Sequence, residues 1–113
     1  MIGVIYLGNN PQTQERLKYL PGQLVKMTTN YKDAAMLCEK TSGSQHYIIF
    51  LEKGNKNEDT VAITYLKKTC PDIYIILLTG ELSNEDRKAY QACGINDTIS
   101  AVASIVELNK QIQ

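Results

Sequence analysis

The sequence predicts an α/β domain built around one five-stranded parallel sheet. Short apolar runs alternate five times with stretches in which apolar residues recur at helical spacing. This alternation is typical of βαβ units, whose right-handed crossovers place helices on both faces of a sheet. The strongest runs are apolar at nearly every position, as strands covered on both faces are.

The five predicted strands differ in the strength of this signal. Three continuous apolar runs are the best candidates, at residues 4–7, 47–51 and 73–78. Two weaker candidates complete the sheet, at residues 23–27 and 95–99. Ligands of open parallel sheets bind at the carboxyl ends of the strands, so we expect any site to lie at the loops that follow these runs.

Helix boundaries follow from capping residues and chain breakers. Pro11 suits the first turn of a helix, and residues 21–22, Pro-Gly, end that helix near residue 20. Pro71 ends the third helix, and Gly94 stands where a C-terminal cap ends the fourth. The fifth helix covers the last residues of the chain. The predicted N-caps are Asn10, Asn30, Asp59 or Asn57, Ser83 and Ser100.

Composition and charge exclude several classes of protein. The 113 residues predict a single domain, 1–113, either free-standing or the regulatory part of a longer protein. Twelve basic and twelve acidic residues leave no net charge for binding nucleic acid, and no apolar run is long enough to predict a membrane span. The three scattered cysteines indicate reduced thiols and no metal site. We therefore expect a cytoplasmic protein.

The order of elements resembles a response-regulator receiver domain, the CheY-like module of two-component signalling. The resemblance covers essentially the whole chain. It implies a flavodoxin-like (βα)5 sandwich of three layers with strand order 2-1-3-4-5. The matching segments are VIYLGNNP at 4–11, NYKDAAML at 30–37, YIIFLE at 47–52, IILLTG at 75–80 and GINDTIS at 94–100.

The residues that perform phosphotransfer in receivers are mostly replaced in this chain. A working receiver has a carboxylate pair that holds Mg²⁺, an aspartate nucleophile, a hydroxyl and a lysine. The resemblance places these positions, in that order, at Gly8 and Asn9, Glu52, Thr79 and Ala101. Only the hydroxyl is kept, and the switch aromatic of the fifth strand falls on Thr98. We expect a degenerate pseudo-receiver with no cofactor, lost or weak Mg²⁺ binding and no catalytic residue.

Two interpretations of Glu52 remain open at this point. Its carboxylate is one methylene longer than that of aspartate, so it could imitate a phosphorylated aspartate by directing negative charge toward Thr79. It could instead be a solvated carboxylate at the end of a strand. Thr79 could likewise be a strand-end hydroxyl bonded to nearby backbone.

The resemblance implies a function in signalling or protein interaction without phosphorylation, and no enzymatic activity. Receivers commonly use the face of helix 4, strand 5 and helix 5 for a homodimer or for output, through a protein partner or a fused domain. Two alternatives are a phosphoaccepting receiver of unusual chemistry and a small-molecule-binding module, such as a flavin protein, on the same fold. A solvated helix surface is the alternative for the interaction face, whose candidate residues are Arg87, Lys88, Tyr90 and Gln91.

Overall fold

A computed structural model describes residues 2–18, 24–40 and 46–100 of the chain. The last predicted helix, and with it Ala101, lies outside these residues. The elements run in the order β1 (Ile2–Leu7), α1 (Pro11–Leu17), β2 (Leu24–Thr28), α2 (Tyr31–Lys40), β3 (His46–Glu52), α3 (Lys56–Thr69), β4 (Tyr74–Thr79), α4 (Asn84–Cys93) and β5 (Asp97–Ser100).

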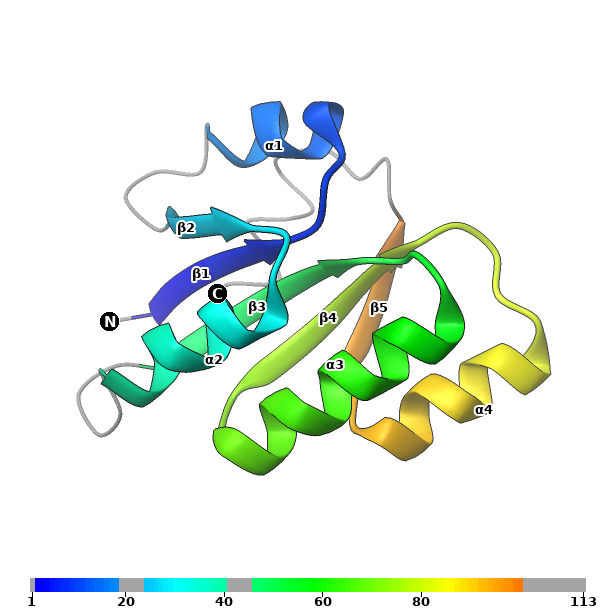
Figure 1. The fold of residues 1–113 in the computed structure, drawn as a ribbon. Coiled ribbons are helices and arrows are strands. Elements are labelled where there is room, and N and C mark those ends of the chain that lie inside the picture. Colours follow the sequence, from blue (N-terminus) through cyan, green and yellow to red (C-terminus); the bar gives the residue numbers. More distant parts are fainter. Residues whose placement is uncertain (1, 19–23, 41–45, 101–113) are drawn as a thin grey trace.

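The five strands form one parallel sheet in the predicted order β2-β1-β3-β4-β5 (Figure 1). The register pairs Leu7 of β1 with Leu51 of β3, so the loops after these two strands begin side by side. Glu52, the last residue of β3, pairs with Leu78, the residue before the end of β4. Gly8, Glu52 and Thr79, which the sequence assigns to chemistry, therefore lie at the same carboxyl-terminal edge of the sheet.

Side chains of alternate strand residues pack into two cores, one on each face of the sheet. One core joins Ile49 and Leu77 to α2, α3 and α4. The other joins Phe50 and Leu78 to Leu17 of α1. Because neighbouring residues of a strand point to opposite faces, continuous apolar runs supply both cores. Figure 1 shows α2, α3 and α4 along one face of the sheet.

Several helix boundaries are as predicted, but α1 ends at Leu17 and not near residue 20, and neither predicted cap of α3 is correct. The side chain of Asn10 caps α1, that of Ser83 caps α4, and Gly94 ends α4 with φ 114°, a left-handed conformation. The third helix begins earlier than predicted, because Asn55 caps it by accepting hydrogen bonds from the amides of residues 57 and 58. Asp59, one of the two predicted caps, is a buried residue of the first turn.

The fifth strand begins two residues later than predicted, and the reason is a side chain. Asn96 donates its backbone amide to the carbonyl of Ile75 (2.8 Å), and its side chain accepts the amide of the same residue (2.8 Å). The amide of Asn96 and its side chain thus hold the chain against β4 just before β5 starts at Asp97. No helix within the described part of the chain has the length and apolarity needed to cross a membrane.

Candidate functional site

The Glu52 carboxylate is held by two hydroxyl groups from the first βα unit. Its Oε1 accepts hydrogen bonds from the Tyr6 hydroxyl of β1 (2.9 Å) and from Thr13 Oγ1 of α1 (2.9 Å). The Tyr6 oxygen also accepts the backbone amide of Asn10 (3.0 Å), at the N-cap of α1. Glu52 is half-buried. The interpretation of Glu52 as a merely solvated carboxylate is therefore wrong.

Glu52 makes no hydrogen bond to Thr79, which the mimic hypothesis requires. Thr79 is 5% exposed, and its Oγ1 has no hydrogen-bond partner among the described residues, neither a carboxylate nor nearby backbone. The physical reason is strand alternation. Glu52 continues the series of Ile48 and Phe50 toward the α1 face, whereas Thr79 continues the series that includes Leu77 toward the opposite face.

The space beside Gly8 is filled, so this position has no room for a side chain. A Cβ atom there would lie 2.6 Å from Glu52 Cβ, 2.7 Å from Tyr6 Oη and 2.9 Å from Tyr6 Cζ. The resemblance to receivers places one of their two acidic residues at this position. In this protein the Tyr6 ring and the Glu52 side chain occupy the volume that such a carboxylate would need.

The residues present do not fit a Mg²⁺ site. Mg²⁺ requires several oxygen ligands in octahedral geometry. Gly8 contributes no side-chain oxygen, Asn9 is exposed, and Oε1 of Glu52 already accepts two hydrogen bonds. Across residues 2–18, 24–40 and 46–100, no group of three His, Cys, Asp or Glu side chains is placed to hold a metal ion.

Burial raises the pKa of the Tyr6 hydroxyl above its ordinary value of 10. The pKa of Tyr6 is raised to about 12, chiefly because the hydroxyl is removed from water. The hydrogen bond from the Asn10 amide lowers this pKa, whereas the hydrogen bond to Glu52 and the negative charge of that carboxylate raise it. Tyr6 is thus a permanent hydrogen-bond donor to Glu52. The contact therefore holds the Glu52 carboxylate against the first βα unit.

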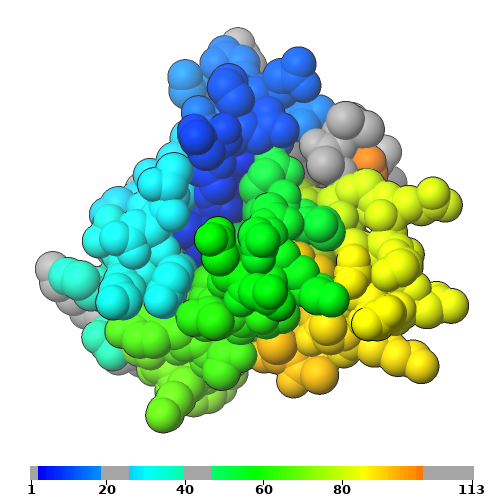
Figure 2. Space-filling view, turned by 45° about the vertical axis from the view of Figure 1, so that its right-hand side comes forward, coloured from blue at the N-terminus to red at the C-terminus, as the bar shows by residue number. Residues whose placement is uncertain are grey.

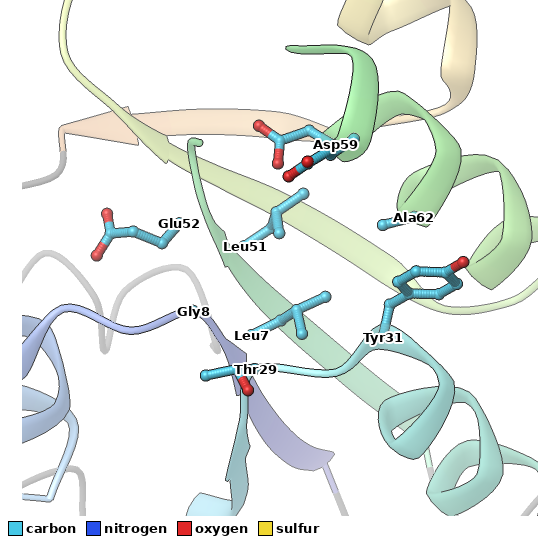
Figure 3. A pocket seen from close by; sticks show the side chains of 9 residues that line it. Leu7, Gly8, Thr29, Tyr31, Leu51, Glu52, Asp59 and Ala62 are labelled. Atoms are coloured by element: carbon cyan, nitrogen blue, oxygen red, sulfur yellow. The ribbon is translucent and has the colours of Figure 1, made fainter. Parts of the chain in front are cut away.

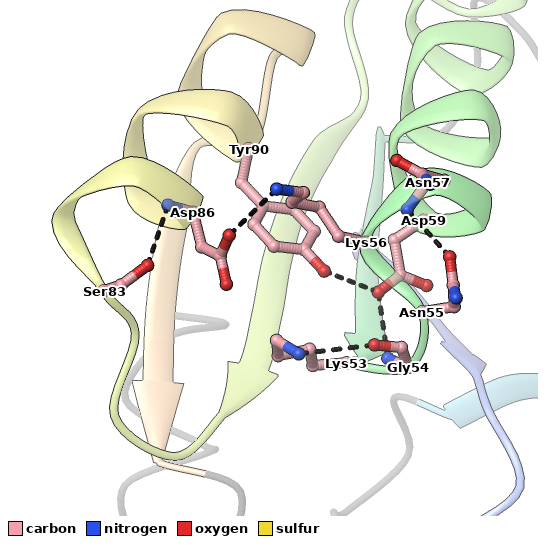
Figure 4. Close-up of polar contacts among 9 residues, drawn as sticks. All are labelled: Lys53, Gly54, Asn55, Lys56, Asn57, Asp59, Ser83, Asp86 and Tyr90. Carbon is pink, nitrogen blue, oxygen red and sulfur yellow. Dashed lines mark hydrogen bonds and ion pairs between the residues drawn. The ribbon is translucent and has the colours of Figure 1, made fainter.

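A second buried polar cluster connects the loop after β3 to α4. Asp59 Oδ2 accepts the Tyr90 hydroxyl (2.7 Å) and the Gly54 amide (2.9 Å), and an ion pair joins Lys56 Nζ to Asp86 Oδ1 (3.1 Å), as Figure 4 shows. Burial raises the pKa of Tyr90, and the hydrogen bond to Asp59 and the charge of this carboxylate raise it further. Tyr90 therefore keeps its proton and donates a hydrogen bond to this carboxylate.

The buried position of Tyr90 corrects the predicted interaction face. Tyr90 is fully buried, so it is not a surface residue, whereas Arg87, Lys88 and Gln91 are exposed on α4. Sequence reasoning missed both Asp59 and Tyr90 as partners. A signal was available: Tyr90 and Cys93 lie three residues apart on a helix whose other residues are polar or alanine, a spacing that indicates its buried side.

A cavity of about 340 Å³ lies on the side of Glu52 opposite to α1. Figure 3 shows that the Glu52 carboxylate points away from Leu51 and Asp59. Glu52 therefore lines the cavity, but its charged group does not point into it. The cavity lies at the carboxyl ends of β1 and β3, where the sequence predicts any site, but its lining from α2 and α3 was not predicted. It is formed by the ends of β1 and β3, the start of α2 and the first turns of α3, with Leu7, Gly8, Thr29, Tyr31, Leu51, Glu52, Glu58, Asp59 and Ala62 as its lining.

Solved structures similar to this chain include a CheY-like protein and response-regulator proteins. One is a CheY-like protein, tadZ, from Pseudomonas aeruginosa PAO1, at 19% identity and a TM-score of 0.78 over 99% of this chain and 97% of that chain. A chain of the Saccharomyces cerevisiae co-crystal of the phosphotransfer protein Ypd1 with the Ssk1 receiver domain matches at 19% identity and a TM-score of 0.69. That match covers 98% of this chain and 86% of the other.

A third neighbour is an atypical orphan response regulator, whose structure is described as revealing a new phosphorylation-independent regulatory mechanism. It is 15% identical, with a TM-score of 0.67, over 99% of this chain and 92% of that chain. No protein-family model matches the sequence, and no curated protein matches it significantly. Identities this low establish the fold alone. The chain has the CheY-like receiver fold.

Proposed function

We propose that this domain is a degenerate receiver that acts in signalling as a protein-interaction module, without phosphorylation and without enzymatic activity. One observation carries the proposal. The Glu52 carboxylate, at the position equivalent to the phosphoacceptor, is bonded to Tyr6 and Thr13. The side chains of Tyr6 and Glu52 also fill the place of the acidic pocket beside Gly8.

The chemistry of phosphotransfer explains why this arrangement is inert. An acceptor carboxylate must present an oxygen in line with the phosphorus atom, and a displacement of about 1 Å already costs roughly 100-fold in rate. Charge on the phosphoryl group must also be neutralised by a metal and a cation. Here the carboxylate is turned toward α1, Gly8 and Asn9 offer no carboxylate, and the lysine position holds Ala101.

The structural neighbours support a role in signalling through other proteins. The atypical orphan regulator is described as phosphorylation-independent, and the yeast co-crystal shows a receiver domain bound to a protein partner. We propose a protein partner or a fused output domain for this chain, acting in the cytoplasm. The exposed Arg87, Lys88 and Gln91 of α4 remain candidates for an output or homodimer face.

The test is an amide NMR titration with Mg²⁺, followed by Mg²⁺ with beryllofluoride as a phosphoryl mimic. We expect no saturable shift at Asn9, Glu52 or Thr79. Saturable shifts that disappear in Glu52→Gln, and persist in the control Glu85→Gln on an exposed part of α4, would reveal a surviving phosphoryl site. That result would overturn the proposal.

The interaction role needs a separate measurement. Charge reversals Arg87→Glu and Lys88→Glu change only exposed side chains of α4, so the fold should be retained. We expect them to weaken partner capture or self-association measured by sedimentation, equally with and without acetyl phosphate in the buffer. Association that requires acetyl phosphate would contradict a phosphorylation-independent module.

A further inference from the structure

Large apolar side chains are exposed along one side of α3. Val61 is 58% exposed and Tyr65, one turn further along, is 41% exposed. Tyr31 of α2 meets Tyr65 edge to face, with ring centroids 5.3 Å apart. Single exposed apolar residues are common, but here half-buried Tyr31 lines a cavity and contacts Tyr65, so the exposed apolar side of α3 begins beside that cavity. We call this surface, with the cavity, the α2–α3 groove.

The interior of the groove is apolar and large enough for a side chain. Leu7, Leu51 and Ala62 line it, and its volume of about 340 Å³ lies within the usual range of ligand pockets, roughly 300–1,000 Å³. Figure 2 shows this side of the molecule, with residues of β1 deep between α2 and α3. A partner side chain with a long aliphatic stem would bury apolar area here.

The charges at the groove have one sign. Glu58 and Asp59 line it, and no lysine or arginine does so among the described residues. Asp59 is already bonded, but the Glu58 carboxylate has no hydrogen bond or ion pair to the described residues, and the nearby Lys56 is paired with Asp86. Since the whole chain has balanced charge, the acidity is a local property.

We propose that the α2–α3 groove binds a segment of a partner protein that carries an arginine or lysine flanked by apolar residues. The cationic head bonds to Glu58 and lies by the Tyr31 ring, while its stem contacts Leu51 and Ala62. The flanking apolar residues cover the exposed part of α3. A small metabolite would leave that exposed surface uncovered. This inference rests on the proposed role in protein interaction and names the partner's chemistry.

The experiment compares two peptides by amide NMR titration. The probes are acetyl-Leu-Arg-Leu-amide and the neutral acetyl-Leu-Gln-Leu-amide. We expect saturable shifts at Tyr31, Glu58 and Tyr65, with the arginine peptide binding about fivefold more tightly. Glu58→Gln should abolish this preference, and Glu85→Gln, an exposed first-turn glutamate of α4, should keep it.

A second pair of variants tests the apolar part of the groove. Tyr65→Ala should weaken both peptides, whereas Tyr74→Ala, which removes a similarly exposed tyrosine (39%) from the start of β4, should weaken neither. Absent shifts in the groove, or equal affinity for the two peptides, would overturn the proposal. So would self-association that Tyr65→Ala abolishes, because a second copy would then be the occupant.

Failure of this inference and failure of the proposed function give different signals. Surviving phosphoryl chemistry appears as shifts at Glu52 and Thr79 on adding Mg²⁺ and beryllofluoride. Peptide binding appears at Tyr31, Glu58 and Tyr65. A negative peptide titration alone rejects the groove and leaves the proposed function standing.

Discussion

Removing one oxygen atom from Tyr90 tests whether the buried contact between α3 and α4 stabilises the fold. The substitution Tyr90→Phe keeps the ring, which is fully buried, and deletes the hydroxyl that donates to Asp59 over 2.7 Å. Asp59 retains the amide of Gly54 as its remaining donor. The change therefore isolates one hydrogen bond without opening a large cavity.

The expected cost follows from the burial and charge of the acceptor. Hydrogen bonds to charged groups contribute about 1.5–3 kcal/mol, and a buried acceptor that loses a donor is not rehydrated. Asp59 is 8% exposed, so we expect Tyr90→Phe to lower the free energy of unfolding by about 2 kcal/mol. In a domain near 100 residues, this corresponds to a fall in melting temperature of roughly 8–12 °C.

The assay is urea denaturation followed by circular dichroism, with melting temperature as a second readout. The matched control is Tyr65→Phe, which removes the hydroxyl of a 41% exposed ring and should change stability by less than about 0.5 kcal/mol. A Tyr90→Phe protein as stable as the wild type, or no less stable than the control, would refute the reasoning.

The pH dependence provides an independent check on the same residue. The fold raises the pKa of Tyr90, so the unfolded chain loses this proton first as pH rises. The native state then binds more protons than the unfolded state, and the free energy of unfolding falls as pH increases above 10, the ordinary pKa of tyrosine. Tyr90→Phe should make this decline shallower, and an unchanged slope would contradict the assignment.

Three further predictions concern the Glu52 site. Gly8→Ala should destabilise the fold by about 1–3 kcal/mol, because the new Cβ overpacks the space beside Tyr6 and Glu52. Gly80→Ala is the control, since nothing lies within 4 Å of its new Cβ. Equal urea midpoints for the two variants would contradict this prediction. Thr13→Val keeps the shape and removes one donor to Glu52, and we expect a loss of about 1 kcal/mol in the same urea assay. Tyr6→Phe should flatten the fall of stability between pH 10 and 12, and a slope equal to that of the wild type would show that Tyr6 does not titrate there.

The chemistry of the site was only partly predictable from the chain. From the identities at Gly8, Asn9 and Glu52, the sequence predicts loss of phosphotransfer and lost or weak Mg²⁺ binding, and both stay predictions. The direction of the Glu52 side chain was not predictable, because it depends on Tyr6 and Thr13, which lie 46 and 39 residues away in sequence. Both interpretations drawn from the sequence considered Glu52 without these partners.

The sequence by itself determined the order of elements, the parallel sheet and several helix boundaries, because apolar periodicity and capping are local properties of the chain. Only the tertiary structure decided which polar groups meet: the Glu52 contacts, the contact of Asp59 with Tyr90, and the groove between α2 and α3. These features join residues from different βα units. Their positions follow from strand register and helix packing, which bring distant segments together and leave no regular spacing in the sequence.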